Sequence, residues 1–362
     1  MERSAGPLRP AAGRQGWLAW VAGIAALAGL AAVPRLGLFA AYLGTEILIA
    51  VLFAQSFHLL FGYTGLLSFG QAAFFGMGAY GVAVLLRDVT QSMAVAMAGA
   101  VALAALCALV IGFLSVRRDE IFFSMLTLAF GMMVYTVAFQ WRSFTGGSDG
   151  LTRFEVPPLN LLVARVDLGD IEQYYYFTLV VVVLGVGFLW RLVQSPFGQV
   201  LVGLRENPQR MAFVGVHVAR YRLAAFVVAG ALSGVAGALM SPFAHIASPV
   251  YVHWTKSAEP VLMTLLGGSR VFLGPAVGAA LFLYLHNLVT QYTDHWEVVL
   301  GGILLVLILF FPDGILGSLV RAYPRWKAMK REPAAARRPL GARGGAPASL
   351  PAAGRASERE GR

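Results

Sequence analysis

Long apolar runs recur along most of this chain, and no other feature of the sequence restricts its fold as strongly. A run of about 20 apolar residues is long enough to cross a bilayer as a helix. With 58% hydrophobic and 13% charged residues, the 362-residue chain also has too little polar surface for a soluble globular protein of this size. The sequence therefore predicts an all-α polytopic membrane protein. The runs cover residues 17–33, 38–61, 93–116, 121–140, 175–194, 223–243 and, with interruptions, 261–311.

The net charge of +10 is carried by the two ends of the chain. Residues 1–16 hold three Arg and one Glu, and residues 321–362 hold eleven Lys or Arg and three Glu. The body between them is neutral, which argues against a nucleic-acid-binding surface. Because Lys and Arg concentrate on the cytoplasmic side of a membrane, we expect a cytoplasmic arm, 1–16, a transmembrane domain, 17–320, and a cytoplasmic tail, 321–362. The composition of the tail predicts disorder beyond about residue 333.

A glycine-dense stretch, residues 62–81, interrupts the apolar pattern. Membrane helices associate through close contact, which small residues allow. We expect a membrane helix here, entered through a turn at Gly62 and Gly65 that leaves Ser68 and Gln71 near its start. Steps of four, four, three and four residues from Ser68 define a close-packing face that holds Ala72, Gly76, Ala79 and Ala83.

The polar connections differ in charge, and this difference predicts their side of the membrane. Residues 195–222 hold four Arg against one Glu and should be cytoplasmic. Residues 141–174 hold three Arg against five acidic residues and should be external, as should residues 244–258. Residues 17–33 could be a signal peptide, but the run exceeds the usual apolar region of about 7–15 residues. We therefore expect an uncleaved first span.

The number of crossings must be even if both ends are cytoplasmic. The obvious segments number nine, namely the first six runs, the glycine-dense element up to about residue 86, and residues 271–289 and 298–311. We therefore expect a tenth, short crossing at residues 259–268, separated from 271–289 by a Gly-Gly-Ser-Arg break. Such a broken hairpin is tolerated where it lines a cavity or is buried in protein. Together with the stretch 62–81 it suggests two inverted repeats. Small residues at a spacing of four recur at Gly230 and Gly234 and at Gly274 and Gly278.

Two proline pairs within residues 195–222 predict capped helices. Ser195-Pro196 and Asn207-Pro208 each place an N-cap residue before a proline at the first helical position, and Gly215 suits a helix end. The second helix would have about two turns and an apolar side. A short amphipathic helix outside the membrane predicts a docking surface for a partner. A helix lying on lipid is the alternative, although the segment is short and weakly basic for that role.

Two charged residues lie within the expected membrane segments, where a charge is costly unless it is paired or hydrated. Glu46 lies inside an apolar run and Arg270 lies in the hairpin break. Each is either a transport-pathway residue or one half of a structural ion pair. The six His share no metal-ligand spacing, the single Cys107 lies in an apolar run, and no hydrolase or nucleotide-binding motif is present. We expect no enzyme activity, metal or cofactor in this chain.

Several motifs together resemble the M-type permease subunit of the bacterial ABC importers for branched-chain amino acids. The resemblance extends from about residue 40 to 320. In chain order the motifs are GYTGLLSFGQAAFFGMGAY (62–80), TGGSDGL (145–151), SPFGQVLVGLRENPQRMAFVGVHVARYRLAAFVVAGALSGVAGAL (195–239), LLGGSRVFLGPAVGAAL (265–281) and FFPDGILG (310–317).

The resemblance implies a multi-subunit importer in the bacterial plasma membrane. Its other parts would be a second, homologous permease, two cytoplasmic ATPase subunits that bind ATP, and an extracytoplasmic substrate-binding protein received by residues 141–174 and 244–258. The segment 195–222 would dock on an ATPase and transmit its ATP-driven motion to the membrane helices. The coupling residues would be Arg205, Glu206, Asn207, Pro208, Arg210, Met211, Phe213 and Gly215.

Similar permeases also serve urea, short amides and other amino acids, so the resemblance leaves the substrate open. A path for branched-chain amino acids should be mostly apolar with a few hydrogen-bonding groups, for which we expect Glu46, Ser68, Gln71 and Tyr80. A self-sufficient channel or secondary carrier is the alternative function. A channel would have no use for a docking helix, and a carrier would show more ionisable residues within its spans.

Overall fold

The computed structural model describes residues 28–117, 120–152, 154–161, 164–293, 295–311 and 313–318. The chain divides into two compact units, Met1–Leu319 and Val320–Arg362, and every described residue lies in the first. The expected arm 1–16, most of the first span 17–33, and the tail 321–362 lie outside the described residues.

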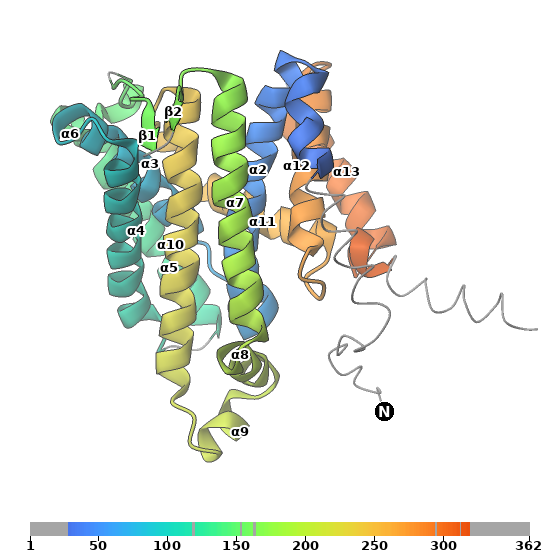
Figure 1. The fold of residues 1–362 in the computed structure, drawn as a ribbon. Helices are drawn as coiled ribbons and strands as arrows, with labels where there is room; N and C mark the ends of the chain where they lie inside the picture. Colours follow the sequence, from blue (N-terminus) through green and yellow to red (C-terminus); the bar gives the residue numbers. More distant parts are fainter. Residues whose placement is uncertain are drawn as a thin grey trace, which may run out of the picture. The chain divides into compact units, whose positions relative to one another are not determined.

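Helices make up most of the described chain (Figure 1). Those long and apolar enough to cross a membrane are α2 (Leu38–His58), which continues into the π-helical turn η2 (Leu59–Thr64), and α4 (Met93–Ser115), α5 (Glu120–Gln140), α7 (Ile171–Gln194) and α10 (Val218–Ala244). Shorter or less apolar helices are α3 (Gln71–Asp88), α11 (Trp254–Gly267), α12 (Gly274–Thr290) and α13 (Trp296–Phe310). The expected all-α polytopic fold is confirmed.

The two longest interior connections lie at opposite ends of the bundle (Figure 1). One end carries α8 (Pro196–Glu206) and α9 (Pro208–Phe213). The other carries α6 (Arg142–Thr145), the 3-10 turn η3 (Gly147–Asp149) and a small hairpin. Its strands β1 (Leu159–Leu161) and β2 (Ala164–Val166) pair antiparallel, and they are a departure from the purely helical expectation. This arrangement fits the opposite sides expected from the loop charges.

Small residues hold α3, α4 and α10 together at the centre of the bundle. Ala96, Ala100, Ala104 and Ala108 form a fully buried stripe along α4. A Cβ added to Gly230 or Gly234 of α10 would collide with the side chains of Ala108 and Ala104 respectively. These small residues bring helix backbones into close contact, which is how membrane helices associate without a hydrophobic driving force.

The contact between α3 and α10 is made by Gly78 and Gly237, neither of which belongs to the expected close-packing face. A Cβ on Gly78 would collide with the carbonyl of Gly234, and one on Gly237 would collide with the carbonyl of Phe75. Gly76, which the spacing assigned to the seam, instead faces the side chain of Val252. The two helices therefore touch backbone to backbone at Gly78, two residues after Gly76 of the expected face.

The entry to α3 also differs from the expectation. Gly62 lies inside η2, so it continues the preceding helix and does not form a turn. Gly65 alone makes the break, because its φ of 75° is a left-handed conformation that favours glycine. The backbone is then irregular up to Gly70, and α3 begins only at Gln71. Ser68 is thus outside the helix and cannot share a helical face with Ala72.

The broken hairpin is confirmed, with an earlier start than expected. The helix α11 begins at Trp254, inside the expected external segment 244–258, and ends at Gly267. Gly268, with φ of 108°, breaks it from α12. A Cβ on Gly278 would collide with the carbonyl of Met263, so the two arms pack with their backbones in contact. The relation of this hairpin to residues 62–81 as an inverted repeat stays a prediction.

Other helices likewise begin earlier than the apolar runs suggest. The helix α7 starts at Ile171, four residues before the expected span, because the side chain of Asp170 accepts a hydrogen bond from the backbone N–H of Glu172 and caps the helix. The helix α10 starts at Val218 and carries polar residues into its first turn. An apolar run thus indicates the part of a helix suited to lipid, and the helix itself can begin several residues before that run.

Candidate functional site

The segment from Ser195 to Gly215 folds as two short helices at one end of the bundle (Figure 1). Asn207 caps α9, since its side-chain oxygen accepts a hydrogen bond from the backbone N–H of Arg210 at 2.9 Å. Pro208 follows at the first helical position, and Gly215 has φ of 90° after the helix. Ser195 precedes Pro196 at the start of α8, but its hydroxyl donates to the carbonyl of Leu192 and makes no capping bond.

The apolar residues of this segment divide between the protein and the solvent. Met211 packs on α8, where its sulfur lies 2.7 Å from the position that a Cβ on Gly203 would take. Phe213 and the adjacent Val214 point away from the protein and are 91% and 77% exposed. Two large, exposed apolar side chains on a short helix at the end of the molecule provide an unoccupied contact surface. We refer to Phe213 and Val214 as the α9 tip.

Arg205 connects this segment to the glycine-rich stretch. Its Nη1 donates a hydrogen bond to the main-chain carbonyl of Gly62 in η2. The aliphatic part of the side chain lies on Gly65, with Cγ 3.2 Å from the position of an added Cβ. Glu206 and Arg210 are exposed. The last turn of α8 is thereby held against the point where α2 ends.

The same end of α2 is bonded to the break of the hairpin. His58 lies one residue before η2, and its Nε2 donates to the carbonyl of Ser269 at 2.9 Å. Gln55 donates to the carbonyl of Phe272 at 2.8 Å. Arg270, which lies between Ser269 and Phe272 in the sequence, is 3.9 Å from a carboxylate oxygen of Asp313. The last turn of α2 therefore contacts the hairpin break, and η2, which follows it directly, contacts α8.

Two of the expected pathway residues lie together at the start of α3. Ser68 and Gln71 are fully buried. The Ser68 hydroxyl accepts a hydrogen bond from the N–H of Gly70 at 3.3 Å. Both polar atoms of the Gln71 side chain are buried without a partner among the described residues. Burial of an amide without a hydrogen-bond partner is costly, so packing alone does not explain the presence of Gln71 at this position.

The other two expected pathway residues lie farther along the bundle. Tyr80 is nine residues after Gln71 on α3, about 13 Å along the helix. Its buried hydroxyl has no partner among the described residues. Glu46 is half-buried on α2 and makes no hydrogen bond or ion pair with another described residue.

The sequence analysis did not assign Lys256 and Glu259 to a site. They form an ion pair of 2.7 Å near the start of α11, and the Nζ of Lys256 lies over the ring of Phe75, which in turn contacts Tyr251. Their spacing of three residues at the start of an apolar helix was the available signal. The same spacing is expected of residues that only mark the edge of the membrane. The sequence alone therefore does not distinguish a functional site from an ion pair at the membrane edge.

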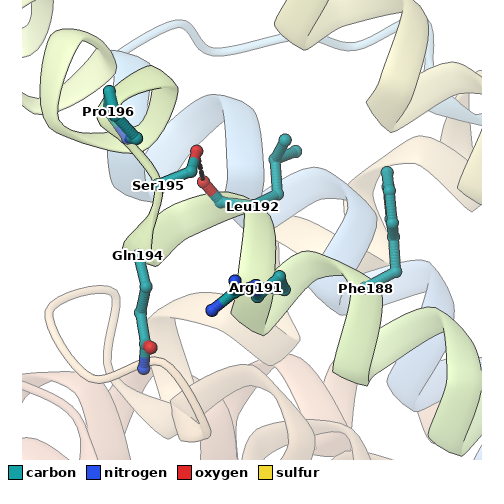
Figure 2. A pocket seen from close by; sticks show the side chains of 6 residues that line it. All are labelled: Phe188, Arg191, Leu192, Gln194, Ser195 and Pro196. Carbon is teal, nitrogen blue, oxygen red and sulfur yellow. Dashed lines mark hydrogen bonds between the residues drawn. The ribbon is translucent and has the colours of Figure 1, made fainter.

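A surface pocket of about 380 Å³ lies at the junction of α7 and α8 (Figure 2). Figure 2 shows Ser195 and Leu192 joined by their hydrogen bond, with Arg191 and Gln194 nearby. None of the expected pathway residues lines this pocket. It is an indentation at the start of α8, and we assign no substrate to it.

Comparison of the sequence with known proteins relates this chain to transport proteins. The profile of a family described as the permease component of branched-chain amino acid transport systems matches residues 39–309. The chain is 24% identical over 293 residues to the high-affinity branched-chain amino acid transport system permease protein LivM of Escherichia coli (strain K12), covering 76% of this chain and 69% of that protein. No solved structure gives a significant match.

Two relatives from Methanocaldococcus jannaschii extend the comparison. The probable branched-chain amino acid transport permease protein LivM is 23% identical over 309 residues, covering 72% of this chain and 88% of that protein. The probable branched-chain amino acid transport permease protein LivH is 27% identical over 168 residues, covering 42% of this chain and 49% of that protein. The chain is thus similar to two differently named permeases.

Proposed function

The chain belongs to the family of permease components of branched-chain amino acid transport systems, and from this premise we propose that it forms half of the translocation pathway of an ABC importer for these amino acids. The chain would catalyse no reaction itself. Two cytoplasmic ATPase subunits would bind and hydrolyse ATP, and an extracytoplasmic binding protein would deliver the substrate.

The observation that carries this proposal is the α9 tip. A capped helix whose two outermost apolar residues are 91% and 77% exposed needs a partner surface. A channel or a self-sufficient carrier has no use for such a helix. An ATPase groove would cover Phe213 and Val214, and Arg205 would carry the movement of α8 to η2.

The second permease is a homologue of this chain. The similarity of one chain to both a LivM and a LivH protein supports two related membrane subunits that pack side by side. The segments at the end of the bundle opposite α9, 141–174 and 244–253, would receive the binding protein. Both ends of the chain would be cytoplasmic, in a bacterial plasma membrane.

Co-purification tests the proposal. The chain, tagged and expressed with its partner subunits, should capture the ATPases and a second permease in stoichiometric amounts from detergent extracts. Arg210→Glu should weaken capture of the ATPases and leave capture of the second permease intact, because Arg210 is exposed at the α9 end. Purification of the chain without any ATPase would contradict the proposal.

A further inference from the structure

The pocket at the junction of α7 and α8 combines a cation with an apolar wall (Figure 2). Its volume of about 380 Å³ lies within the range of about 300–1,000 Å³ that is typical of small-molecule sites. None of the residues that line it is acidic, so the charge in the pocket is positive. The lining comes from the last two turns of α7 and the start of α8: Phe188, Arg191, Leu192, Gln194, Ser195 and Pro196.

Arg191 and Gln194 supply the hydrogen-bond donors of this pocket. Neither side chain makes a hydrogen bond or an ion pair with another described residue. The hydroxyl of Ser195 donates to the carbonyl of Leu192 at 2.6 Å, so toward a ligand it acts only as an acceptor. The free donors therefore select a ligand that carries acceptor atoms, and the planar guanidinium group matches the geometry of a phosphate.

An exposed apolar face of α7 leads directly to Arg191. Steps of four, four and three residues connect Val180, Leu184, Phe188 and Arg191, which places the four residues on one side of the helix. The three apolar side chains are 57%, 68% and 51% exposed. Gly187 lies on the same side, and no atom lies within 4 Å of a Cβ added there, so the face is hollowed next to Arg191. We refer to Val180, Leu184, Gly187 and Phe188 as the α7 stripe.

The length of α7 places this pocket at the edge of the membrane. The 18 residues between Glu172 and Arg191 are uncharged and extend about 27 Å along the helix, close to the roughly 30 Å of the hydrocarbon core. Trp190, next to Arg191, is 49% exposed, and Trp is enriched where a helix meets the membrane surface. The α7 stripe therefore faces hydrocarbon, and Arg191 lies at the level of the lipid headgroups.

We propose that this pocket binds the phosphate of one anionic phospholipid whose acyl chains lie along the α7 stripe. The guanidinium group of Arg191 and the amide N–H groups of Gln194 would donate to the phosphate oxygens. The pocket would hold the headgroup, and the hollow at Gly187 would admit an acyl chain beside Phe188. The inference goes beyond the proposed function, because a bound lipid is neither a transported substrate nor a subunit.

Arg191 alone does not make a lipid site, since a cation in the last turn of a helix is favourable in any case. The pocket and the α7 stripe meet at Arg191, however, and the stability of α7 requires neither of them. A free phosphate ion would use the donors and leave the apolar face uncovered. An anionic phospholipid matches both parts, and basic pockets at the ends of membrane helices are suited to such headgroups.

Thermal unfolding of the purified full-length chain in a neutral detergent tests the site. Phosphatidylglycerol should raise the melting temperature, because a ligand that binds only the folded chain stabilises it. Phosphatidylcholine with the same acyl chains should require at least an about tenfold higher concentration for the same rise, since its choline group neutralises the phosphate. Glycerol phosphate, which has no acyl chains, should give no rise in the concentration range of the two lipids. Equal effects of the two lipids, or of phosphatidylglycerol and glycerol phosphate, would overturn the proposal.

Variants of Arg191 locate the effect in this pocket. Arg191→Gln should abolish the preference for phosphatidylglycerol over phosphatidylcholine, and Arg191→Lys, which keeps the charge, should retain most of it. Arg191 is exposed, so neither change should prevent folding. The matched control is Arg117→Gln, because Arg117 is an exposed Arg just after α4 and does not line the pocket. A wild-type preference in Arg191→Gln would overturn the site.

A variant of the α7 stripe tests the place of the acyl chains. Gly187→Phe fills the hollow and leaves Arg191 unchanged, so it should raise the concentration of phosphatidylglycerol needed for the half-maximal rise in melting temperature several-fold. The second permease is the other molecule that could cover this face. If Gly187→Phe lost capture of that subunit and bound phosphatidylglycerol as the wild type does, the stripe would be a protein contact and the proposal would be overturned.

Discussion

Arg205 of α8 donates a hydrogen bond to the main-chain carbonyl of Gly62, although 143 residues separate them in the sequence. The bond joins α8 to the π-helical turn that continues α2. The adjoining end of α2 is bonded through His58 to Ser269 in the hairpin break. A chain of contacts thus connects α8 to the break at Gly65 directly and to the break at Gly268 through the end of α2. A π-helical turn at such a junction agrees with the frequent occurrence of these turns at functional sites.

Replacing Arg205 by alanine should uncouple ATP hydrolysis from transport. The variant loses the bond to Gly62 and the packing on Gly65, while the α9 tip stays intact. We expect the ATPases to co-purify as in the wild type and the ratio of leucine transported to ATP hydrolysed to fall several-fold. Both quantities are measured on the same proteoliposomes. Arg220→Ala, an exposed Arg of the same segment, is the control and should keep the ratio.

Replacing Phe213 by aspartate should abolish capture of the ATPases. The side chain is 91% exposed, so the change leaves the fold of this chain intact and places a charge in the partner contact. Pull-down with the tagged chain measures the loss. Tyr292→Asp alters an 82% exposed residue in the turn between α12 and α13 and should not affect capture. Equal capture by the Phe213 variant would show that α9 is not the contact.

Replacing Gly78 by alanine should destabilise the bundle. The added Cβ would collide with the backbone carbonyl of Gly234, which has no flexible side chain to move aside. Overpacking of this kind costs about 1–3 kcal/mol. The melting temperature of the purified chain in detergent should therefore fall. Gly187→Ala on α7 is the control, because nothing lies within 4 Å of its added Cβ, and a drop of equal size in that variant would argue against a specific contact at Gly78.

Replacing Gln71 by leucine should separate stability from transport. The amide is fully buried and has no partner among the described residues, so an apolar side chain of similar size removes a desolvation cost. We expect an unchanged or higher melting temperature together with reduced leucine uptake. Unchanged uptake with an intact complex would remove Gln71 from the expected pathway residues. Ser68→Ala provides the same comparison at a residue that already has a hydrogen bond.

The apolar runs predicted the helices well, because the length needed to cross a bilayer is visible in one dimension. The caps at Asn207 and Gly215 and the break at Gly268 were also readable, since each depends on neighbours in the chain. Contacts between segments that lie far apart in the sequence could not be predicted in this way. The choice of Gly78 over Gly76 as the contact with α10 depends on how two helices are rotated against each other, which a stripe of small residues on one helix does not fix.

The loop before α11 shows the same limit. Tyr251 and Val252 belong to a segment that looks like an external loop, yet the ring of Tyr251 contacts Phe75 of α3 and Val252 packs on Gly76. The alanine stripe of α4, spaced by four residues, was a signal in the sequence for a close helix contact, and it pairs with Gly230 and Gly234.

ATP dependence of leucine accumulation tests the central claim most directly. The complete complex, reconstituted into proteoliposomes with the binding protein outside and ATP enclosed, should accumulate leucine against its gradient. Vesicles that enclose ADP, or that hold this chain without the ATPases, should not. Uptake that persists without ATP, or that follows an imposed proton or sodium gradient, would contradict an ATP-driven permease and show that the chain is a self-sufficient carrier.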